Sequence, residues 1–289
     1  MRVFVAGATG AVGRLLVPLL LAAGHEVTGT SRSRAGVDRI RAQGAAAVQV
    51  NALDADGLRR AVAEAAPEAV VHQLTDLADA NGAANSRLRR EGTRNLVDAC
   101  EAAGVGRVVA QSICWAYPPG DGPADESVPL DATASQPRAA MVAAVRALEE
   151  TASEAAVAVL LRYGILYGPG TWYAPGGAVA AALEGDPAAR FLGSVEADDA
   201  VSSFVHVADA AQAAVAALGW PGGPVNIVDD EPAPAHEWLP VLAKALGVPV
   251  PKPSAGRQGW QRGAVNSLAR ARGWRPGHPS WRTGFTARW

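Results

Sequence analysis

The sequence is poor in cysteine, with two in 289 residues, and both Cys100 and Cys114 lie in apolar segments. Secreted proteins that depend on disulfides use more cysteine, so this scarcity argues against a disulfide framework and is typical of a reducing cytoplasm. Basic residues are not in excess either, because the formal net charge is −2. That balance excludes the broad positive surface that nucleic-acid binding needs. We therefore expect a cytoplasmic protein with no nucleic-acid partner.

A hydrophobic run long enough to cross a bilayer is also missing. The most apolar short run, residues 15–23, contains Pro18 and ends at Gly24, well short of the ~20 residues of a transmembrane helix. A strand and a glycine turn precede it, where a secretory signal would carry a basic segment. With 49% hydrophobic and 19% charged residues, the chain can bury a full core. The sequence thus predicts a soluble globular protein that makes no membrane contact.

Short apolar segments alternate with segments of helical length and spacing over more than half of the chain. We expect buried strands at residues 2–6, 25–30, 46–50, 69–72, 107–112 and 157–162. We expect helices between them at residues 10–23, 37–43, 54–66, 85–103 and 139–153. Strands that are apolar throughout are buried on both faces, as in parallel sheets covered by crossover helices. The alternation predicts an α/β fold with a doubly wound parallel sheet of the Rossmann type.

The strongest local motif is Gly7-Ala8-Thr9-Gly10-Ala11-Val12-Gly13, directly between the first strand and the first helix. The first glycine permits a tight turn, the second lets the backbone approach a pyrophosphate, and the third lets the helix pack closely on the sheet. Free N–H groups at the helix start would face the phosphates. We therefore predict a dinucleotide site formed by Gly7, Thr9, Gly10, Ala11, Val12 and Gly13.

The choice of dinucleotide is made at the end of the second strand. NAD-binding proteins usually carry an acid there to hold the ribose hydroxyls, but this chain has Thr30-Ser31-Arg32-Ser33-Arg34 and no carboxylate until Asp38. Hydroxyls and guanidinium groups suit a 2′-phosphate, because arginine forms charge-assisted bonds to phosphate oxygens. We expect NADP(H), contacted by Ser31, Arg32 and Arg34. The alternative is a solvated basic loop.

The regular alternation ends after Gly164. Gly, Pro and Trp cluster at residues 167–177, and the tail from residue 219 to 289 is rich in Pro and Trp. We interpret residues 1–165 as an NADP-binding Rossmann domain, to which a segment around 200–228 returns. Residues 166–289 then form a smaller, interleaved substrate-binding lobe. Open α/β sheets bind ligands at the carboxyl ends of their strands, where this lobe is expected.

In their order, several segments resemble the extended and atypical branches of the short-chain dehydrogenase/reductase superfamily. They are Asn51-Ala52-Leu53-Asp54, Glu91-Gly92-Thr93-Arg94-Asn95-Leu96, the stretch 161–170, Phe204-Val205-His206-Val207-Ala208-Asp209 and Gly273-Trp274-Arg275-Pro276. The resemblance implies cofactor contacts at Asn51 and Ala52, and it places Tyr163 beside the nicotinamide ribose. Gln73, at the end of the fourth strand, is expected at the same cofactor edge of the sheet.

One element of that family is missing. Its members carry a proton-donating tyrosine, with a lysine four residues later, on the helix expected at 139–153. Aligned on Glu149, the tyrosine position holds Met141 and the lysine position holds Val145; the only lysines of the chain are Lys244 and Lys252. Ser112 keeps the position of the family's catalytic Ser or Thr. A hydroxyl alone can orient a carbonyl but is a poor acid at neutral pH.

Two functional hypotheses follow. In the first, the protein is an NADPH-dependent ketoreductase whose proton comes from water, another side chain or the substrate, because the cofactor carries the hydride chemistry. The missing pair is similar to that of antibiotic-tailoring ketoreductases of the family that act on angucyclinones. A bulky, polycyclic aromatic polyketide ketone is then expected. In the second hypothesis the protein is an inactive, NADP(H)-sensing binding module. Epimerases and dehydratases of nucleotide sugars are disfavoured, because their chemistry relies on the missing tyrosine.

Candidate residues for the substrate site follow the fifth strand. Ser112 would orient a substrate oxygen, although a strand-end hydroxyl is often only a turn contact. Tyr117 could line the pocket or replace the missing donor, or it could simply pack. Trp115 is expected to contact the substrate. Further along, Trp172 and Tyr173 lie in a glycine-flanked loop and would suit a large flat substrate. Alternatively, this pair pins the loop onto the lobe.

The histidines offer little support for other chemistry. His72 ends the fourth strand, and we favour a structural role or a ribose contact over proton transfer, because nothing nearby orients it. His206 lies in a family landmark, which indicates a structural role. Neither has partners at metal-binding spacing, so no metal site is predicted.

Overall fold

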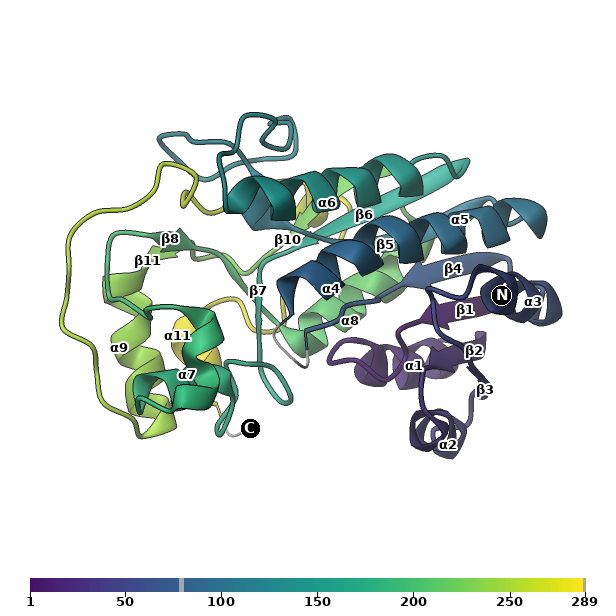
Figure 1. Cartoon of the computed structure of the whole chain (residues 1–289), viewed down its shortest axis with the longest axis horizontal. Helices are drawn as coiled ribbons and strands as arrows, with labels where there is room; N and C mark the ends of the chain where they lie inside the picture. The colour runs from purple at the N-terminus through teal and green to yellow at the C-terminus, as the bar shows by residue number, and fades with distance from the viewer. Residues whose placement is uncertain (78–80, 288–289) are drawn as a thin grey trace. The chain divides into compact units, whose positions relative to one another are not determined.

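Seven strands form the main sheet (Figure 1). They are β1 (Arg2–Ala6), β2 (Glu26–Ser31), β3 (Ala46–Gln49), β4 (Ala69–His72), β5 (Arg107–Ile113), β6 (Val157–Tyr163) and β10 (Gly223–Ile227). Their order is β10-β6-β5-β4-β1-β2-β3, and the pairings from β3 to β5 are parallel. The strand order reverses between β1 and β4, which is the switch point where such sheets bind ligands. The predicted doubly wound α/β fold is confirmed.

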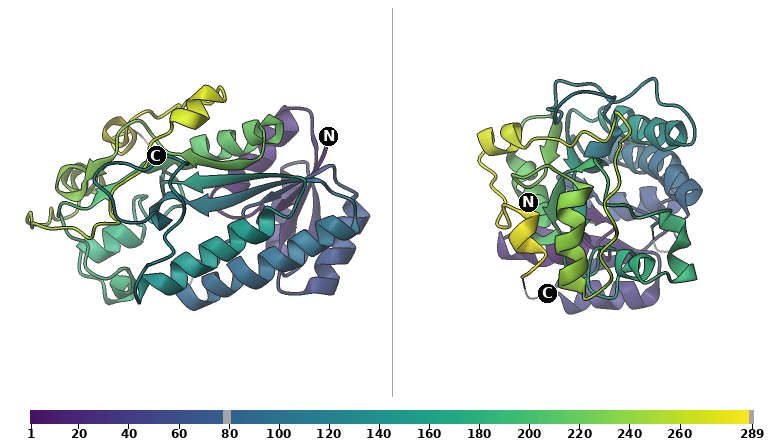
Figure 2. Two further views of the ribbon diagram at one scale, coloured as in Figure 1. Left: turned by 90° about the horizontal axis from the view of Figure 1, so that it is seen from above. Right: turned by 90° about the vertical axis from the view of Figure 1, so that its left-hand side faces the viewer.

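Helices cover both faces of this sheet. They are α1 (Gly13–Ala22), α2 (Arg34–Ala42), α3 (Ala55–Ala65), α4 (Gly82–Arg87), α5 (Thr93–Ala102), α6 (Arg138–Ala152) and α8 (Val207–Ala216). Figure 2 shows α5 and α6 side by side on one face, with α1 and α8 on the other. The helix expected at 85–103 is interrupted by a π-helical turn at Leu88–Gly92, which separates α4 from α5. Helix α1 begins at Gly13 rather than at residue 10, because the glycine motif forms the preceding turn.

The core of the sheet follows the apolar runs that predicted the strands. Phe4 and Val70 are fully buried on neighbouring strands and pack with Leu58 of α3 and Leu96 of α5. Leu16 of α1 is buried as well, so each face of the sheet is covered. Asp54 caps α3 by accepting a hydrogen bond from the Gly57 N–H at 3.0 Å, as the sequence predicts. These contacts hold the strands in place, and the candidate site lies at the carboxyl ends of these strands.

The structure is a computed structural model that describes residues 1–77 and 81–287. The described chain divides into two compact units. The first comprises residues 1–112, 132–161 and 211–225, and the second comprises residues 113–131, 162–210 and 226–289. This division differs from the sequence-based one at residues 113–131, which begin with the last residue of β5, and at residues 162–165 and 200–210; all of these belong to the second unit. Within the described residues, none of the helices is long and apolar enough to span a membrane.

The second unit is built from short elements. They are β7 (Ile165–Tyr167), α7 (Ala178–Leu183), β8 (Val201–Ser202), β9 (Phe204–His206), β11 (Ala233–Pro234), α9 (Ala235–Leu246), α10 (Ser267–Ala271) and α11 (Trp281–Gly284). Strand β7 pairs with β9 in parallel, and β8 pairs with β11 in antiparallel fashion. An aromatic cluster forms the core, in which Tyr167, Phe204 and Phe285 meet edge to face at 5.0 to 6.2 Å between ring centroids. Aromatic packing therefore replaces the regular alternation of strands and helices here.

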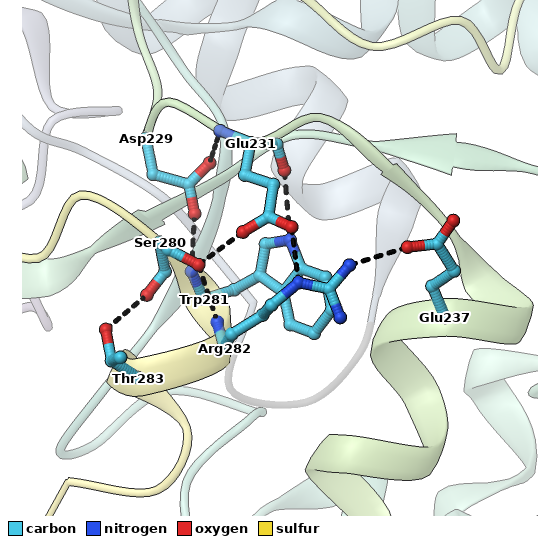
Figure 3. Close-up of polar contacts among 7 residues, drawn as sticks. All are labelled: Asp229, Glu231, Glu237, Ser280, Trp281, Arg282 and Thr283. Atoms are coloured by element: carbon cyan, nitrogen blue, oxygen red, sulfur yellow. Dashed lines mark hydrogen bonds and ion pairs between the residues drawn. The ribbon is translucent and has the colours of Figure 1, made fainter.

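Polar contacts fix the last helix to this unit (Figure 3). Asp229 accepts the backbone N–H groups of Trp281 at 2.9 Å and of Glu231 at 3.3 Å. The indole N–H of Trp281 donates to the Glu231 carbonyl at 2.9 Å. Arg282 pairs with both Glu231 and Glu237. Because Trp281 is fully buried, these contacts satisfy the polar atoms that its burial removes from water.

Candidate dinucleotide and substrate site

The glycine motif forms the turn after β1, and two of its glycines are required by the protein itself. Gly7 has a φ of +91°, and a Cβ placed there would stand 2.5 Å from the carbonyl oxygen of Gln73. A Cβ on Gly13 would stand 2.2 Å from the carbonyl oxygen of Gly7. Any side chain at either position would collide with backbone. These two glycines therefore set the tight turn and the close start of α1, as the motif predicts.

The middle glycine is different. A Cβ on Gly10 would meet only the Gly7 carbonyl oxygen, at an ordinary contact distance of 3.4 Å. Gly10 is also exposed, whereas Val12 and Gly13 are buried. Packing within the protein therefore does not explain the glycine, but the close approach of a ligand's phosphates to bare backbone does. Thr9 and Ala11, on either side of it, are partly exposed. The residues present fit a dinucleotide pyrophosphate.

The end of β2 carries the residues expected to select the dinucleotide. Ser31 is 7% exposed and its Oγ accepts the Ser33 N–H at 3.2 Å, so it shapes the loop. Arg34 is exposed and lies 3.4 Å from Asp38. The exposed Arg32 guanidinium lies 3.3 Å from a carboxylate oxygen of Asp76, which follows β4. The sequence shows no acid in this loop, but the sheet brings one to it. This contact was missed because β4 lies far from β2 in sequence.

The segments after β3 and β4 complete this edge of the first unit. Asn51 is exposed, and its Oδ1 accepts the Leu53 N–H at 3.1 Å. Ala52 is buried, and its carbonyl accepts from Asn95 at 2.9 Å. The Gln73 N–H donates to the Ala6 carbonyl at 2.8 Å, which holds it beside the glycine turn. These positions all lie at the carboxyl ends of their strands, on the side where a dinucleotide is expected.

His72, the last residue of β4, is fully engaged. Its Nδ1 accepts the Leu74 N–H at 3.2 Å, and its Nε2 lies 2.9 Å from the Thr93 hydroxyl. An accepting Nδ1 means that Nε2 carries the ring proton and donates to Thr93. Burial lowers the pKa of His72 to about 4, so the ring is neutral at physiological pH. The structural alternative predicted for His72 fits this geometry.

Ser112 and Glu149 meet at the end of β5. The Ser112 hydroxyl donates to Glu149 Oε1 at 2.6 Å, and both residues are buried. Glu149 lies on α6, two turns after Met141 and one turn after Val145, so the positions where the family carries tyrosine and lysine share its face. The hydroxyl thus links β5 to α6. This geometry favours the structural alternative for Ser112 over substrate orientation.

Tyr117 lies in a buried polar network of the second unit. Its hydroxyl donates to Asn226 Oδ1 at 2.7 Å and accepts from Arg162 at 2.9 Å. Burial raises the pKa of Tyr117 to about 12, which makes the phenol a weaker acid than free tyrosine. The contacts therefore argue against the hypothesis that Tyr117 replaces the missing donor. Trp115, two residues before Tyr117, is partly buried and packs against a small apolar cluster that includes the Tyr117 ring.

The remaining aromatic candidates also lie in the second unit. The Tyr163 hydroxyl is buried and donates to the Ala210 carbonyl at 3.3 Å. The Tyr173 ring packs against Phe204 at 5.7 Å between centroids, and burial raises the pKa of Tyr173 to about 12. This packing favours the alternative in which Tyr173 pins its loop. Trp172 instead meets Phe191 edge to face at 5.3 Å, and Phe191 is 44% exposed. This pair presents an aromatic surface.

His206, Asp209 and His278 form the one group of potential metal ligands in the described chain, with ligand atoms within 4.8 Å of one another. The Asp209 carboxylate already accepts from the Gly277 and His278 N–H groups and lies 3.0 Å from His278 Nδ1. His206 Nδ1 accepts the Ala208 N–H at 3.2 Å, so its Nε2 carries the proton and has no lone pair for a metal. The two rings stack at 3.7 Å. Hydrogen bonding within the unit accounts for this group.

A Rossmann sheet with a glycine turn fitted to phosphates defines a dinucleotide-binding protein. Residues 3–227 match the NAD dependent epimerase/dehydratase family. The chain belongs to this family, and the resemblance to extended short-chain dehydrogenases/reductases is confirmed. It is an enzyme of that family, with a nicotinamide dinucleotide as its cofactor.

The chain is also similar to individual proteins over nearly its whole length. The chain is 46% identical, over 99% of both chains, to the 3-diazoavenalumate denitrifying reductase of a Streptomyces species. Among solved structures it is similar to the UDP-glucose 4-epimerase of Thermus thermophilus in complex with NAD, with 27% identity, a TM-score of 0.75, and 99% and 98% of the two chains covered. The Thermotoga maritima UDP-glucose 4-epimerase with UDP-glucose shares the fold, with 20% identity, a TM-score of 0.77, and 99% and 96% covered.

Proposed function

We propose that this protein is an NADPH-dependent reductase of aromatic substrates that works without a proton-donating tyrosine. The observation that carries the proposal is the pair Met141 and Val145, which stands where the family has its acid and the lysine that tunes it. Support comes from the relative of 46% identity, which is named a denitrifying reductase of a diazo compound. Epimerisation of a nucleotide sugar would need the missing tyrosine.

The chemistry of a diazo substrate explains why an acid can be absent. An arene diazonium ion that accepts a hydride loses dinitrogen and becomes the arene, so a C–H bond replaces the C–N bond. The hydride brings both electrons and the hydrogen, and no proton enters the balance. A ketone that accepts a hydride instead becomes an alkoxide and needs a proton, which is the task of a general acid. The absence of such an acid therefore favours an aromatic diazo substrate.

A ketone of a polycyclic aromatic polyketide is the second candidate, as part of antibiotic or other secondary metabolism. The same absence supports it when the ketone has a neighbouring aryl hydroxyl, because that hydroxyl can supply the proton. In both cases the aromatic surface of Trp172 and Phe191 suits a flat substrate.

The residues of the first unit would perform the binding. The backbone around Gly10 would hold the pyrophosphate, and the segments at Asn51, Ala52 and Gln73 would line the remainder of the dinucleotide. Arg32 and Arg34 would contact the 2′-phosphate of NADPH through charge-assisted hydrogen bonds. When bound, the reduced nicotinamide supplies the hydride. In the second unit, Tyr163 is proposed to lie near the nicotinamide ribose, and Trp115 is proposed to contact the substrate.

The test offers the purified protein NADPH carrying deuterium at the transferable C4 position. One arm adds an arene diazonium salt, and the other adds a polycyclic ketone with a neighbouring hydroxyl. Boiled protein controls for the direct reaction of diazonium salts with NADPH. We expect enzyme-dependent NADPH consumption and deuterium in the reduced product of one arm, with release of dinitrogen in the diazonium arm. If NADPH binds tightly but neither substrate is reduced, the protein is an NADP(H)-sensing module instead.

A further inference from the structure

Arg89 is a partly buried cation that lacks an anionic partner in the described part of the chain. It lies in the π-helical turn Leu88–Gly92 and is shielded from water to an intermediate degree. Two other arginines of these helices are neutralised: Arg87 lies 2.7 Å from Glu91, and Arg94 lies 2.8 Å from Asp98. Among residues 1–77 and 81–287, no carboxylate lies within 4.0 Å of the Arg89 guanidinium and no hydrogen bond from it is formed. Arg89 thus differs from Arg87 and Arg94 in its lack of a partner, and from the exposed Arg90 in its partial burial.

Its place in the fold is near the carboxyl end of β4. Arg89 lies one helical turn before Thr93, whose hydroxyl accepts from His72 at the end of β4. Helix α5 runs back antiparallel to β4, so the turn before Thr93 lies toward the carboxyl end of that strand. The charge of Arg89 acts on the ring of His72 and helps to lower its pKa. Gln73 follows His72 in the chain, and its carbonyl oxygen is the atom that a Cβ on Gly7 would collide with. The guanidinium therefore belongs to the dinucleotide edge of the first unit.

Leaving such a group unpaired is costly. Burial lowers the pKa of Arg89 to about 10, so the group stays charged at neutral pH although it is removed from much of its water. A desolvated charge needs an opposite charge and hydrogen bonds to offset the lost hydration. A guanidinium offers five N–H donors in a planar fork that matches carboxylate and phosphate oxygens. Local π-helical geometry is also frequent at functional sites.

We propose that Arg89 binds an oxyanion of a ligand that occupies the carboxyl ends of β1 and β4. This inference rests on the proposed function, because the two sources of such an anion are the dinucleotide phosphates and a carboxylate of the aromatic substrate. Arg89 would then fix the ligand at the switch point of the sheet. A carboxylate on the substrate would make the enzyme selective for aromatic acids over their esters.

The test compares Arg89→Gln with Arg90→Gln. Arg90 is the matched control, because it is adjacent, exposed and also without a carboxylate partner among the described residues. Calorimetry first measures the Kd of NADPH for wild type and both variants. It then measures the Kd of cinnamate and of methyl cinnamate in the presence of saturating NADP⁺. A loss of a charge-assisted bond predicts a rise of about tenfold or more in one Kd for Arg89→Gln. The control should change it less than about twofold.

The two arms identify the source of the anion. A rise in the Kd of NADPH assigns Arg89 to the dinucleotide. A rise for cinnamate alone, with methyl cinnamate binding weakly to all forms, assigns it to the substrate. If Arg89→Gln binds NADPH and cinnamate as wild type does, the inference is wrong while dinucleotide binding stands. If wild type binds no dinucleotide, the proposed function fails, and the inference fails with it.

Thermal unfolding without ligand tests whether the role of Arg89 is purely structural. Because Arg89→Gln removes a charge that has no carboxylate partner among residues 1–77 and 81–287, its melting temperature should equal or exceed that of wild type. Arg89→Lys, which keeps the charge but loses the planar fork, should fold equally well and bind with intermediate affinity. A fall of more than ~5 °C in both variants would show that Arg89 serves the fold instead, and would overturn the inference.

Discussion

The Ser112 hydroxyl donates a 2.6 Å hydrogen bond to Glu149, and both residues are buried. This bond joins β5 to α6 at the position where the family places a catalytic hydroxyl. Ser112, which the family resemblance suggests as a catalytic residue, therefore has a structural role in this geometry. Neither Met141 nor Val145, at the family's tyrosine and lysine positions on α6, has a titratable side chain.

Replacing Ser112 with Ala should therefore affect stability more than catalysis. The change removes a donor from a buried carboxylate, which costs about 1–3 kcal/mol of unfolding free energy. We expect kcat/KM to fall less than about tenfold, or ~1.4 kcal/mol. Chemical denaturation and steady-state kinetics measure the two effects. A fall in kcat/KM of more than about a hundredfold at unchanged stability would return Ser112 to the catalytic machinery.

The glycine turn allows binding and folding to be separated. Gly13→Ala would drive a Cβ into the Gly7 carbonyl oxygen, and overpacking of this kind costs about 1–3 kcal/mol or more. Gly10→Ala has room within the protein, so its unfolding free energy should stay within about 1 kcal/mol of wild type. Its Kd for NADPH should nevertheless rise about tenfold or more, because the Cβ would stand between backbone and phosphate. Equal NADPH binding by Gly10→Ala and wild type would contradict the assignment of the phosphate site.

The contact between Arg32 and Asp76 bears on the choice between NADPH and NADH. Both side chains retain solvent exposure, so the pair is weak and the guanidinium can turn to a 2′-phosphate. Arg32→Ala should weaken NADPH binding about tenfold and leave NADH binding nearly unchanged. Asp76→Asn should have the opposite effect on NADPH, because it removes a competitor for Arg32. Titration with both dinucleotides tests this, and a loss of NADH affinity in Asp76→Asn would show that Asp76 holds ribose hydroxyls and that NAD is preferred.

His72 should make stability depend on pH. The folded state holds the pKa of His72 at about 4, below the value of about 6.5 expected in the unfolded chain. The unfolded state therefore binds a proton more readily between these values, so stability is lost as the pH falls from about 6.5 to 4. His72→Gln should be less stable than wild type at pH 7 but should lose less stability over that window.

Denaturation midpoints measured at several pH values provide the comparison. Wild type, measured in parallel at the same pH values, is the reference. An unchanged slope in His72→Gln would mean that His72 is not buried in its neutral form.

The sequence predicted the first unit well because its signals are local. Alternating apolar strands and helices, the cap at Asp54 and the Gly7 turn each act over a few residues, and each is found in the structure. The missing Tyr and Lys pair is likewise visible without coordinates. Family similarity then confirmed the fold and the class of cofactor.

The rest depends on contacts between distant segments. Tyr117 was a reasonable donor until Asn226 and Arg162 were found to engage its hydroxyl. Asp76 reaches Arg32 only because β4 and β2 flank β1 in the sheet. The π-helical turn that holds Arg89 has no clear sequence signature, since it differs from an α-helix only in hydrogen bonds that span five residues instead of four. Such features arise from the assembled sheet rather than from local preference.

The interleaving of the two units sets a constraint on how the protein can be made. Strand β10, at the edge of the main sheet, ends at Ile227, after the chain has twice left the first unit and returned to it. A ribosome must therefore release more than two thirds of the polypeptide before the nucleotide-binding unit can close. Nascent chains will expose the flank of β6 until then, and a nonsense mutation upstream of β10 should yield an aggregation-prone product rather than a smaller working enzyme.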